Sequence, residues 1–213
     1  MNNIEFVLPS EIEKRSFQII EKELEERGIK FSEEEKPVTM RVIHTSADFD
    51  YAQNLCYSDK AIETAKNLIL SGAHIVTDTN MAKAGINGKV LAKFGGEVHC
   101  FMADKDVAEE AKQRSITRAT VSMERAARLN KKIIFAIGNA PTALISLYDM
   151  MTKQIFTPDF IIGVPVGFVN VVQAKELFLN SNVPYIISKG RKGGSNIAAA
   201  ICNALLYELG GRS

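Results

Sequence analysis

From about residue 58 onward, short apolar runs alternate with longer amphipathic stretches. The apolar runs are HIVTDT, EVHCF, KIIFAIG, DFIIGVP and PYIIS, which begin at residues 74, 97, 132, 159 and 184. The stretches between them, such as DKDVAEEAKQR and VNVVQAKELFLNS, carry apolar residues at helical spacing. Short apolar strands that alternate with helices are typical of a parallel sheet covered on both faces. The pattern therefore predicts a five-stranded, doubly wound α/β core over residues 58–213.

A helical extension over residues 1–57 is predicted to precede this core. Ser10 and Glu13 have the spacing of a capping box, and apolar residues follow at near-helical intervals. Gly28 ends the run and predicts the end of the first helix. With no linker, repeat or low-complexity tract in the sequence, we expect residues 1–213 to form one domain.

The segment FSEEEKPVTMRVIH, which follows this helix, is compatible with two structures. Val38, Met40 and Val42 alternate with polar residues as in a strand. The same residues also fit a helix opened by Ser32 with Glu35 three positions later. We predict the helix.

Composition and charge narrow the class of protein. Hydrophobic residues make up 46% of the 213 residues, as expected of a globular chain with a real core. The net charge is only +1, whereas a nucleic-acid protein usually carries a basic surplus. The three cysteines form no CxxC pair, and no apolar run approaches the ~18 residues of a membrane span. We therefore expect a cytoplasmic protein with reduced thiols and no nucleic-acid or membrane partner.

The residues that follow each predicted strand are the first place to look for a binding site, because ligands bind outside the carboxyl ends of parallel strands. These segments are TDTNMAKAGI, GNAPTAL, PVGFVN and KGRKGGSNIAAA. Several of them open helices, whose free N–H groups favour anions. Each alone is compatible with ordinary turn chemistry, and Asp78 could simply cap the next turn. Together they suit a ligand with several carboxylates or phosphates.

The chain has only three histidines, at positions 44, 74 and 99. His74 and His99 lie in predicted strands and are expected to be structural. His44 ends its element and faces a polar segment, where it could exchange a proton near neutral pH. The alternative is a histidine stabilised by a helix C-terminus. No His, Cys or Asp cluster has ligand spacing, so no metal site is expected.

Arg118 in SITRATVSM is a second candidate, since an arginine beside hydroxyl groups can bind a carboxylate in bidentate fashion. A solvated arginine at a helix end is the alternative.

Several motifs together resemble those of one family. EIEKRSFQII, RVIH, TRATVSM, GNAPTAL, GVPVGFV and GRKGGSNIAAAICNAL are similar to segments of the precorrin-8X methylmutases of cobalamin biosynthesis. The resemblance runs from about residue 10 to residue 206. It implies a flavodoxin-like, three-layer fold and a homodimer with the active site near the subunit interface.

The resemblance also implies a reaction. The family moves a methyl group from C-11 to C-12 of precorrin-8X or cobalt-precorrin-8, giving hydrogenobyrinate or cob(II)yrinate, without an organic cofactor. The substrate is a tetrapyrrole with several carboxylate arms. Between the two substrates we expect the cobalt-containing one.

Site residues follow from matching positions. The proton-transferring histidine of the family falls on His44, the substrate-contacting serine of RSF on Ser16, and the arginine of TR on Arg118. HTSADFD departs from some members directly after the histidine, which leaves Thr45, Ser46 and Asp48 without an assigned role. Further substrate contacts are expected from the segments that follow the strands: Thr79, Thr117, Asn139, Gly193, Gly194 and Ser195.

Two alternatives from other classes stay open at this point. A corrinoid carrier would bind the macrocycle through the same segments but would not need His44. A nucleotide-binding regulator of flavodoxin-like fold would place phosphates at the same sheet edge.

Overall fold

The structure is a computed structural model that describes residues 5–211, and it is built on one six-stranded sheet. The strands are β1 (Leu55–Tyr57), β2 (His74–Thr77), β3 (Val98–His99), β4 (Ile133–Ile137), β5 (Phe160–Gly163) and β6 (Tyr185–Ser188). They lie in the order β1-β6-β5-β4-β2-β3, and every pair except β1 with β6 is parallel. The five parallel strands therefore follow the flavodoxin-like order, which confirms the predicted doubly wound core.

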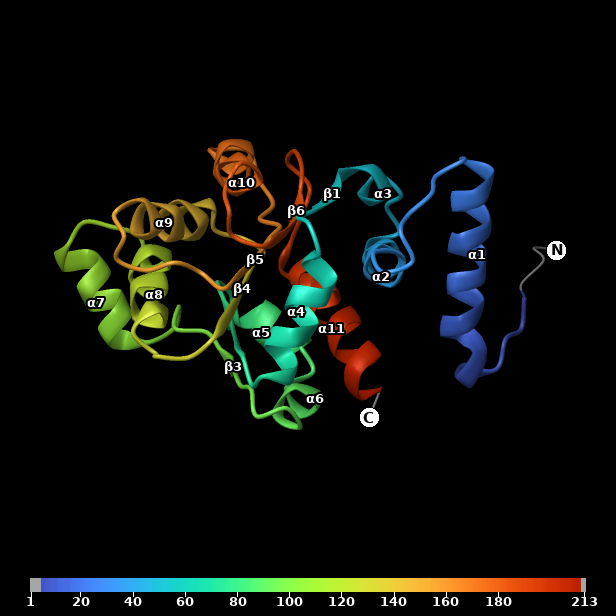
Figure 1. The fold of residues 1–213 in the computed structure, drawn as a ribbon, viewed down its shortest axis with the longest axis horizontal. Helices are drawn as coiled ribbons and strands as arrows, with labels where there is room; N and C mark the ends of the chain where they lie inside the picture. Colours follow the sequence, from blue (N-terminus) through green and yellow to red (C-terminus); the bar gives the residue numbers. More distant parts are fainter. Residues whose placement is uncertain (1–4, 212–213) are drawn as a thin grey trace.

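Helices cover both faces of the sheet (Figure 1). One face carries α4 (Ala61–Leu70), α5 (Asn80–Gly85), α6 (Gly88–Ala92) and α11 (Ser195–Gly210). The other carries α8 (Arg118–Ala127), α9 (Pro141–Thr152) and α10 (Val171–Leu179), with α7 (Lys105–Gln113) packed on α8. Strands β4 and β5 are buried along their whole length, because both faces are covered.

The N-terminal extension adds a further layer outside α11 (Figure 1). It consists of a 3₁₀ turn (Pro9–Glu11), α1 (Ile12–Glu26), α2 (Lys36–Ser46) and α3 (Tyr51–Asn54). Helix α2 packs along α11, so α11 is buried on nearly all sides. The helical prediction for the segment around Val38 is confirmed, and its strand alternative is wrong.

Two local predictions in this extension had different outcomes. Gly28 follows the end of α1 with φ +67°, a conformation that favours glycine, as the sequence indicated. The capping box is wrong, because Ser10 lies inside the 3₁₀ turn and no side chain caps α1. Pro9 begins that turn and shifts the helix start past Ser10.

The predicted strand count of five is also wrong, because β1 is a sixth strand inside the segment predicted to be helical. Leu55, Cys56 and Tyr57 pair antiparallel with β6 at the edge of the sheet. Tyr57 is held there by a 2.7 Å hydrogen bond between its hydroxyl and that of Thr39. Three residues are too few to show a periodic pattern, so only the tertiary contacts define this strand.

Over the described residues, every helix is too short or too polar to span a lipid bilayer.

Candidate active site

His44 lies in the last turn of α2 and is half-buried against α1. Its imidazole stacks on the ring of Phe17, with 5.2 Å between centroids and 28° between planes. Arg41 is one turn earlier on the same face of α2, where the helical spacing of three residues places it beside His44. The Arg41 guanidinium lies 4.8 Å from the Phe17 ring centroid and pairs with Glu13 of α1.

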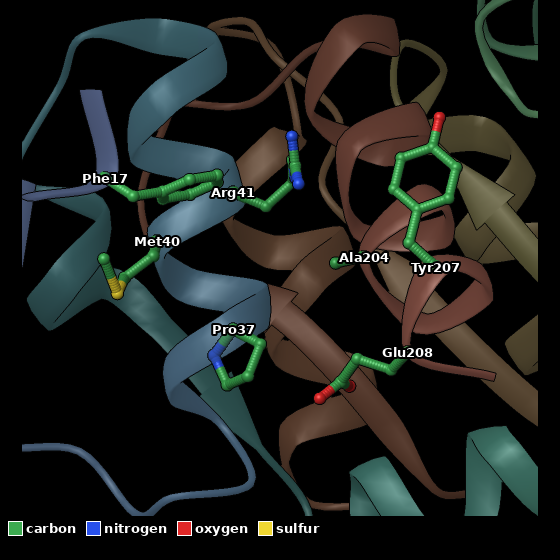
Figure 2. A pocket seen from close by; sticks show the side chains of 7 residues that line it. All are labelled: Phe17, Pro37, Met40, Arg41, Ala204, Tyr207 and Glu208. Carbon is green, nitrogen blue, oxygen red and sulfur yellow. The ribbon is translucent and has the colours of Figure 1, made fainter. Parts of the chain in front are cut away.

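Two adjoining cavities lie between α2 and α11. Figure 2 shows the first, of about 330 Å³, with Arg41 of α2 and Tyr207 of α11 on facing walls. The second, of about 380 Å³, is lined by His44 together with the same Arg41 and Tyr207. Asn196, directly after Ser195 at the start of α11, also lines the second cavity. The histidine therefore faces a space that reaches the start of α11, at the carboxyl edge of the sheet.

The surroundings of His44 favour the neutral form of its imidazole in the free protein. Burial lowers the pKa of its imidazole below the ordinary value, and the positive charge of Arg41 lowers it further. Across residues 5–211, no group hydrogen-bonds to either ring nitrogen of His44. An imidazole with free nitrogens beside a cavity is equipped to exchange a proton with a bound molecule.

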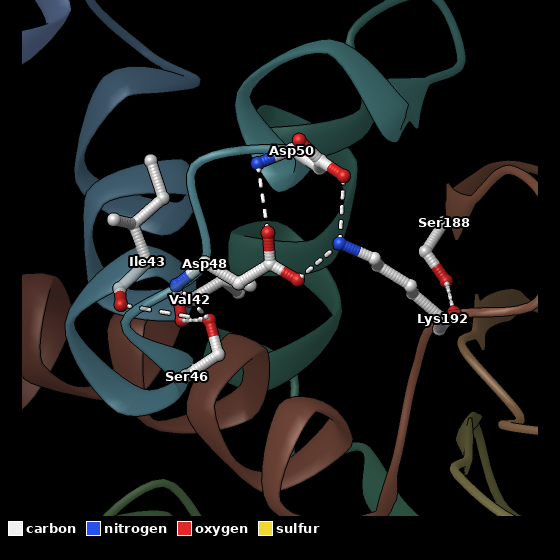
Figure 3. Close-up of polar contacts among 7 residues, drawn as sticks. All are labelled: Val42, Ile43, Ser46, Asp48, Asp50, Ser188 and Lys192. Carbon is white, nitrogen blue, oxygen red and sulfur yellow. Dashed lines mark hydrogen bonds and ion pairs between the residues drawn. The ribbon is translucent and has the colours of Figure 1, made fainter.

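The segment directly after His44 is held by a network of polar contacts (Figure 3). Ala47 ends α2 in the left-handed conformation, and Asp48 follows it. Lys192, from the loop between β6 and α11, contacts the carboxylates of Asp48 and Asp50 at 2.6 Å each. The Ser46 hydroxyl donates to the Val42 carbonyl at 2.8 Å. These contacts hold the end of α2 against the loop before α11.

The carboxyl edge of the sheet brings together several predicted site residues. Thr79 caps α5, and its hydroxyl lies 2.7 Å from that of Ser195. The Gly194 N–H donates to the Val164 carbonyl at 2.9 Å, so this N–H is already used within the protein. A Cβ at Gly193 would lie 2.1 Å from the same carbonyl oxygen, which explains why that position needs glycine.

Asp78 binds the loop between β4 and α9, directly before the helix begins. Its fully buried carboxylate accepts backbone N–H groups from Gly138 at 2.9 Å and Asn139 at 2.8 Å, and from Ala140. Asp78 therefore joins the loop after β2 to the loop after β4, the neighbouring strand. The Asn139 side chain itself is exposed.

The remaining predicted residues lie apart from His44. Thr117 caps α8 and donates from its hydroxyl to that of Thr142 at 3.2 Å. Arg118 is exposed at the start of α8, on the opposite side of the sheet from α2. Ser16 is half-buried on α1 and donates from its hydroxyl to the Ile12 carbonyl at 2.9 Å. Their roles in substrate binding stay predictions.

Sequence reasoning missed Phe17, Arg41 and Tyr207 as neighbours of the catalytic candidate. Phe17 directly follows the predicted Ser16, and Arg41 begins the RVIH motif, so both lay next to residues already singled out. Tyr207 reaches the cavity only because α11 packs against α2, and nothing in its local sequence indicates that contact.

The flavodoxin-like sheet and the cavity that His44 lines between the N-terminal extension and α11 define a doubly wound α/β protein with a candidate binding site at this junction. The sequence profile described as precorrin-8X methylmutase matches residues 11–208. The chain belongs to the precorrin-8X methylmutase family, and it is therefore an isomerase of cobalamin biosynthesis.

Individual relatives agree with this assignment. A cobalt-precorrin-8 methylmutase from Priestia megaterium is 41% identical, over 93% of this chain and 88% of its own length. A cobalt-precorrin-8 methylmutase from Salmonella typhimurium is 42% identical, over 94% of this chain and 96% of its own. The solved precorrin-8X methylmutase of Thermus thermophilus superposes with a TM-score of 0.82 at 36% identity, covering 92% of this chain and 96% of that one.

Proposed function

We propose that this protein moves the methyl group of cobalt-precorrin-8 from C-11 to C-12, and that His44 is its proton donor and acceptor. The observation that carries the role of His44 is its imidazole, which faces the cavity between α2 and α11 with both nitrogens free. The cobalt-containing substrate is supported by the names of the two relatives that are 41% and 42% identical.

The methyl migration requires from the protein a group that can donate a proton to the ring system and take it back. The methyl group leaves C-11 and bonds to C-12 of the same molecule, so no external methyl donor, oxidant or reductant takes part. A proton given to the ring system by His44 biases the conjugated electrons toward the rearranged isomer, and its return leaves the histidine unchanged. General acid catalysis of this kind contributes typically ~10²–10⁴-fold to the rate.

The carboxylate arms of the substrate would help His44 to act as a proton donor. Substrate carboxylates beside Arg41 would offset the positive charge that lowers the His44 pKa in the free protein. Binding would then favour the protonated imidazole at the moment when a proton is needed. The Phe17 ring beside His44 offers an apolar surface for the macrocycle.

Replacement of His44 tests the catalytic proposal. We expect His44→Ala to reduce turnover of cobalt-precorrin-8 by at least ~10²-fold while the substrate still binds, as seen from its visible absorption. Circular dichroism of the variant checks that the fold is retained. Parent-like turnover in a folded His44→Ala protein would overturn the role of His44. Binding without any isomerisation by the parent protein would instead favour a corrinoid carrier.

The preference for cobalt is tested with the parent protein alone. We expect a higher kcat/KM for cobalt-precorrin-8 than for metal-free precorrin-8X, measured side by side. A higher kcat/KM for the metal-free substrate would contradict this part of the proposal and leave the role of His44 untouched.

We further propose that the protein acts as a homodimer. The loop after β5 exposes 80% of Phe168 and 78% of Val169, an apolar surface that suits a protein interface. A second copy placed here would enlarge the binding surface beyond one chain. Light scattering after size exclusion should show a dimer, and a Phe168→Glu, Val169→Glu variant should shift toward the monomer; a monomeric parent would exclude the dimer.

We propose a cytoplasmic location because the cysteine thiols are free rather than paired in disulfides. Cys56, Cys100 and Cys202 are all free, as expected of proteins in a reducing compartment. Burial raises the pKa of Cys202 to about 12, so this thiol is unreactive. No organic cofactor is proposed, because the methyl group stays within the substrate.

A further inference from the structure

His74, Glu97 and His99 meet on one face of the sheet at its edge. Strands β2 and β3 are parallel, with Val76 opposite His99, and the Ile75 N–H donates to the Glu97 carbonyl at 2.9 Å. Because side chains alternate between faces, Glu97 and His99 point to the same side of β3. His74 and Val76 point to that side of β2, so the three side chains lie together.

The donor atoms of these three side chains are close enough to share one ion. His74 Nδ1 and His99 Nε2 are 2.7 Å apart, and the two rings are nearly parallel, at 3°. His99 Nδ1 lies 4.0 Å from a Glu97 carboxylate oxygen. One ligand atom from each residue fits within 4.8 Å of the others. Two imidazoles and one carboxylate form a donor set that zinc enzymes use.

We propose that His74, Glu97 and His99 bind one divalent transition-metal ion of the Zn²⁺ or Co²⁺ class, which ties the edge strand β3 to β2. Imidazole donors select this class over Mg²⁺ and Ca²⁺, which prefer oxygen ligands. The site is independent of the proposed methyl migration, since its residues do not line the cavities beside His44.

An ion would replace the hydrogen bond between the two imidazoles, so the rings would turn as well as separate. Two ligands of a tetrahedral zinc ion at ~2.0 Å bonds are about 3.3 Å apart, so the two imidazole nitrogens would separate by about 0.6 Å. The Glu97 side chain is 70% exposed, which leaves it free to rotate toward them. The edge strand β3 is only two residues long, and an ion would add a cross-link where hydrogen bonding is sparse.

The charges and neighbours around the cluster support a cation. The negative charge of Glu97 would partly neutralise a divalent ion. His99 also stacks on Phe101, at 5.8 Å between centroids, which restricts the orientation of its ring.

Titration of the chelator-treated, substrate-free protein with Co²⁺ tests this site. We expect one Co²⁺ per chain, with visible d–d bands typical of nitrogen and oxygen ligands. Zn²⁺ should displace the Co²⁺ and should raise the thermal unfolding midpoint, because an ion that binds only the folded state stabilises it. Absence of binding at millimolar metal, or a sulfur-to-cobalt charge-transfer band, would overturn the assignment.

Variants locate the ion within the chain. His74→Asn and His99→Asn should each weaken Co²⁺ binding by more than ~100-fold, and Glu97→Gln by at least ~10-fold. His44→Asn is the matched control, because it removes the only other histidine and should leave Co²⁺ binding unchanged. Glu97 is exposed, so Glu97→Gln should fold even if a histidine variant does not. Unchanged Co²⁺ affinity in a folded His99→Asn or Glu97→Gln protein, or its loss in His44→Asn, would refute the site.

Discussion

At the scale of single residues, the chemistry of the site depends on what surrounds one imidazole. His44 is half-buried, stacked on Phe17, and one helical turn from a guanidinium. Arg41 is itself held by Glu13 of α1, so its charge stays close to the imidazole. The two effects, burial and a neighbouring cation, both favour the neutral form of His44 in the free protein.

Removal of the Arg41 charge should therefore raise the pKa of His44. We expect an increase in Arg41→Gln, because the cation is lost while the carboxylate of Glu13 remains. Titration of the imidazole signals by NMR measures this pKa directly, and assignment is simple with three histidines in the chain. Since the proposed acid is the protonated imidazole, the fall of kcat/KM with rising pH should move to higher pH in the variant.

A matched variant makes this prediction specific. Arg118→Gln removes an exposed arginine on the other side of the sheet and should leave the His44 pKa unchanged. An unchanged or lower His44 pKa in Arg41→Gln would show that Arg41 does not act on the imidazole.

At the scale of elements, one buried carboxylate joins the loops that follow β2 and β4. Asp78 directly follows β2. The backbone N–H groups that donate hydrogen bonds to its carboxylate belong to the loop after β4, the neighbouring strand in the sheet. The bond therefore joins the two loops at the point where the strand order reverses. Burial raises the pKa of Asp78, and the three N–H donors oppose that increase by stabilising the carboxylate.

Conversion of this carboxylate to an amide should be costly. In Asp78→Asn one acceptor oxygen becomes a donor that faces backbone N–H groups, and we expect a loss of about 2–4 kcal/mol in the free energy of unfolding. Urea denaturation measures the loss. Asp159→Asn is the comparison, because Asp159 also accepts a backbone N–H, from Ile133 at 2.9 Å, but is only half-buried. Equal effects of the two variants would contradict a special role of Asp78.

At the scale of the whole molecule, the loop between β6 and α11 connects the core to the N-terminal extension. Lys192 of this loop pairs with Asp48 and Asp50, next to the end of α2 (Figure 3). From the core side, the buried Lys175 of α10 donates to the carbonyls of Gly190 and Lys192, at 2.8 Å each. A neutral amine has two hydrogens, one for each carbonyl.

The buried amine makes the stability of the molecule depend on pH. Burial lowers the pKa of Lys175 to about 8 from an ordinary value of 10.5. Between these values the unfolded chain binds a proton that the folded Lys175 has lost, so Lys175 contributes an increase of the free energy of unfolding with pH, by roughly 3 kcal/mol at most. The buried Cys202 thiol contributes in the opposite direction above its ordinary pKa, so the contribution of Lys175 is read from the difference between the parent protein and the variant. In Lys175→Met this increase should disappear, as measured by urea denaturation from pH 8 to 10.5.

Exposed Lys189 in the same loop provides the control for this measurement. Lys189→Met should retain the pH dependence of the parent protein. If Lys175→Met also retained it, the amine would be protonated in the folded state and the assignment would be wrong.

Much of this architecture could be predicted from the sequence, because it depends on residues that are close together in the chain. Each parallel strand is a short apolar run between amphipathic helices, because both of its faces are buried. Gly28 marked a helix end through its own backbone preference. His44 was found by its position at the end of an apolar helix and by the motif around it. The strand Leu55–Tyr57 was missed, because its pairing with β6 depends on residues more than a hundred positions away.

The sequence by itself determined the alternation of strands and helices, the parallel core, the helix that carries His44 in its last turn and the family to which the chain belongs. Only the tertiary structure decided that Asp78 binds the loop after β4 and that Arg41 and Tyr207 face one another beside His44. It alone also places His74 and His99 within 2.7 Å, although 25 residues separate them in the chain. The physical reason is that periodicity and capping act between near neighbours, whereas a cavity or an ion site depends on side chains that come together through packing.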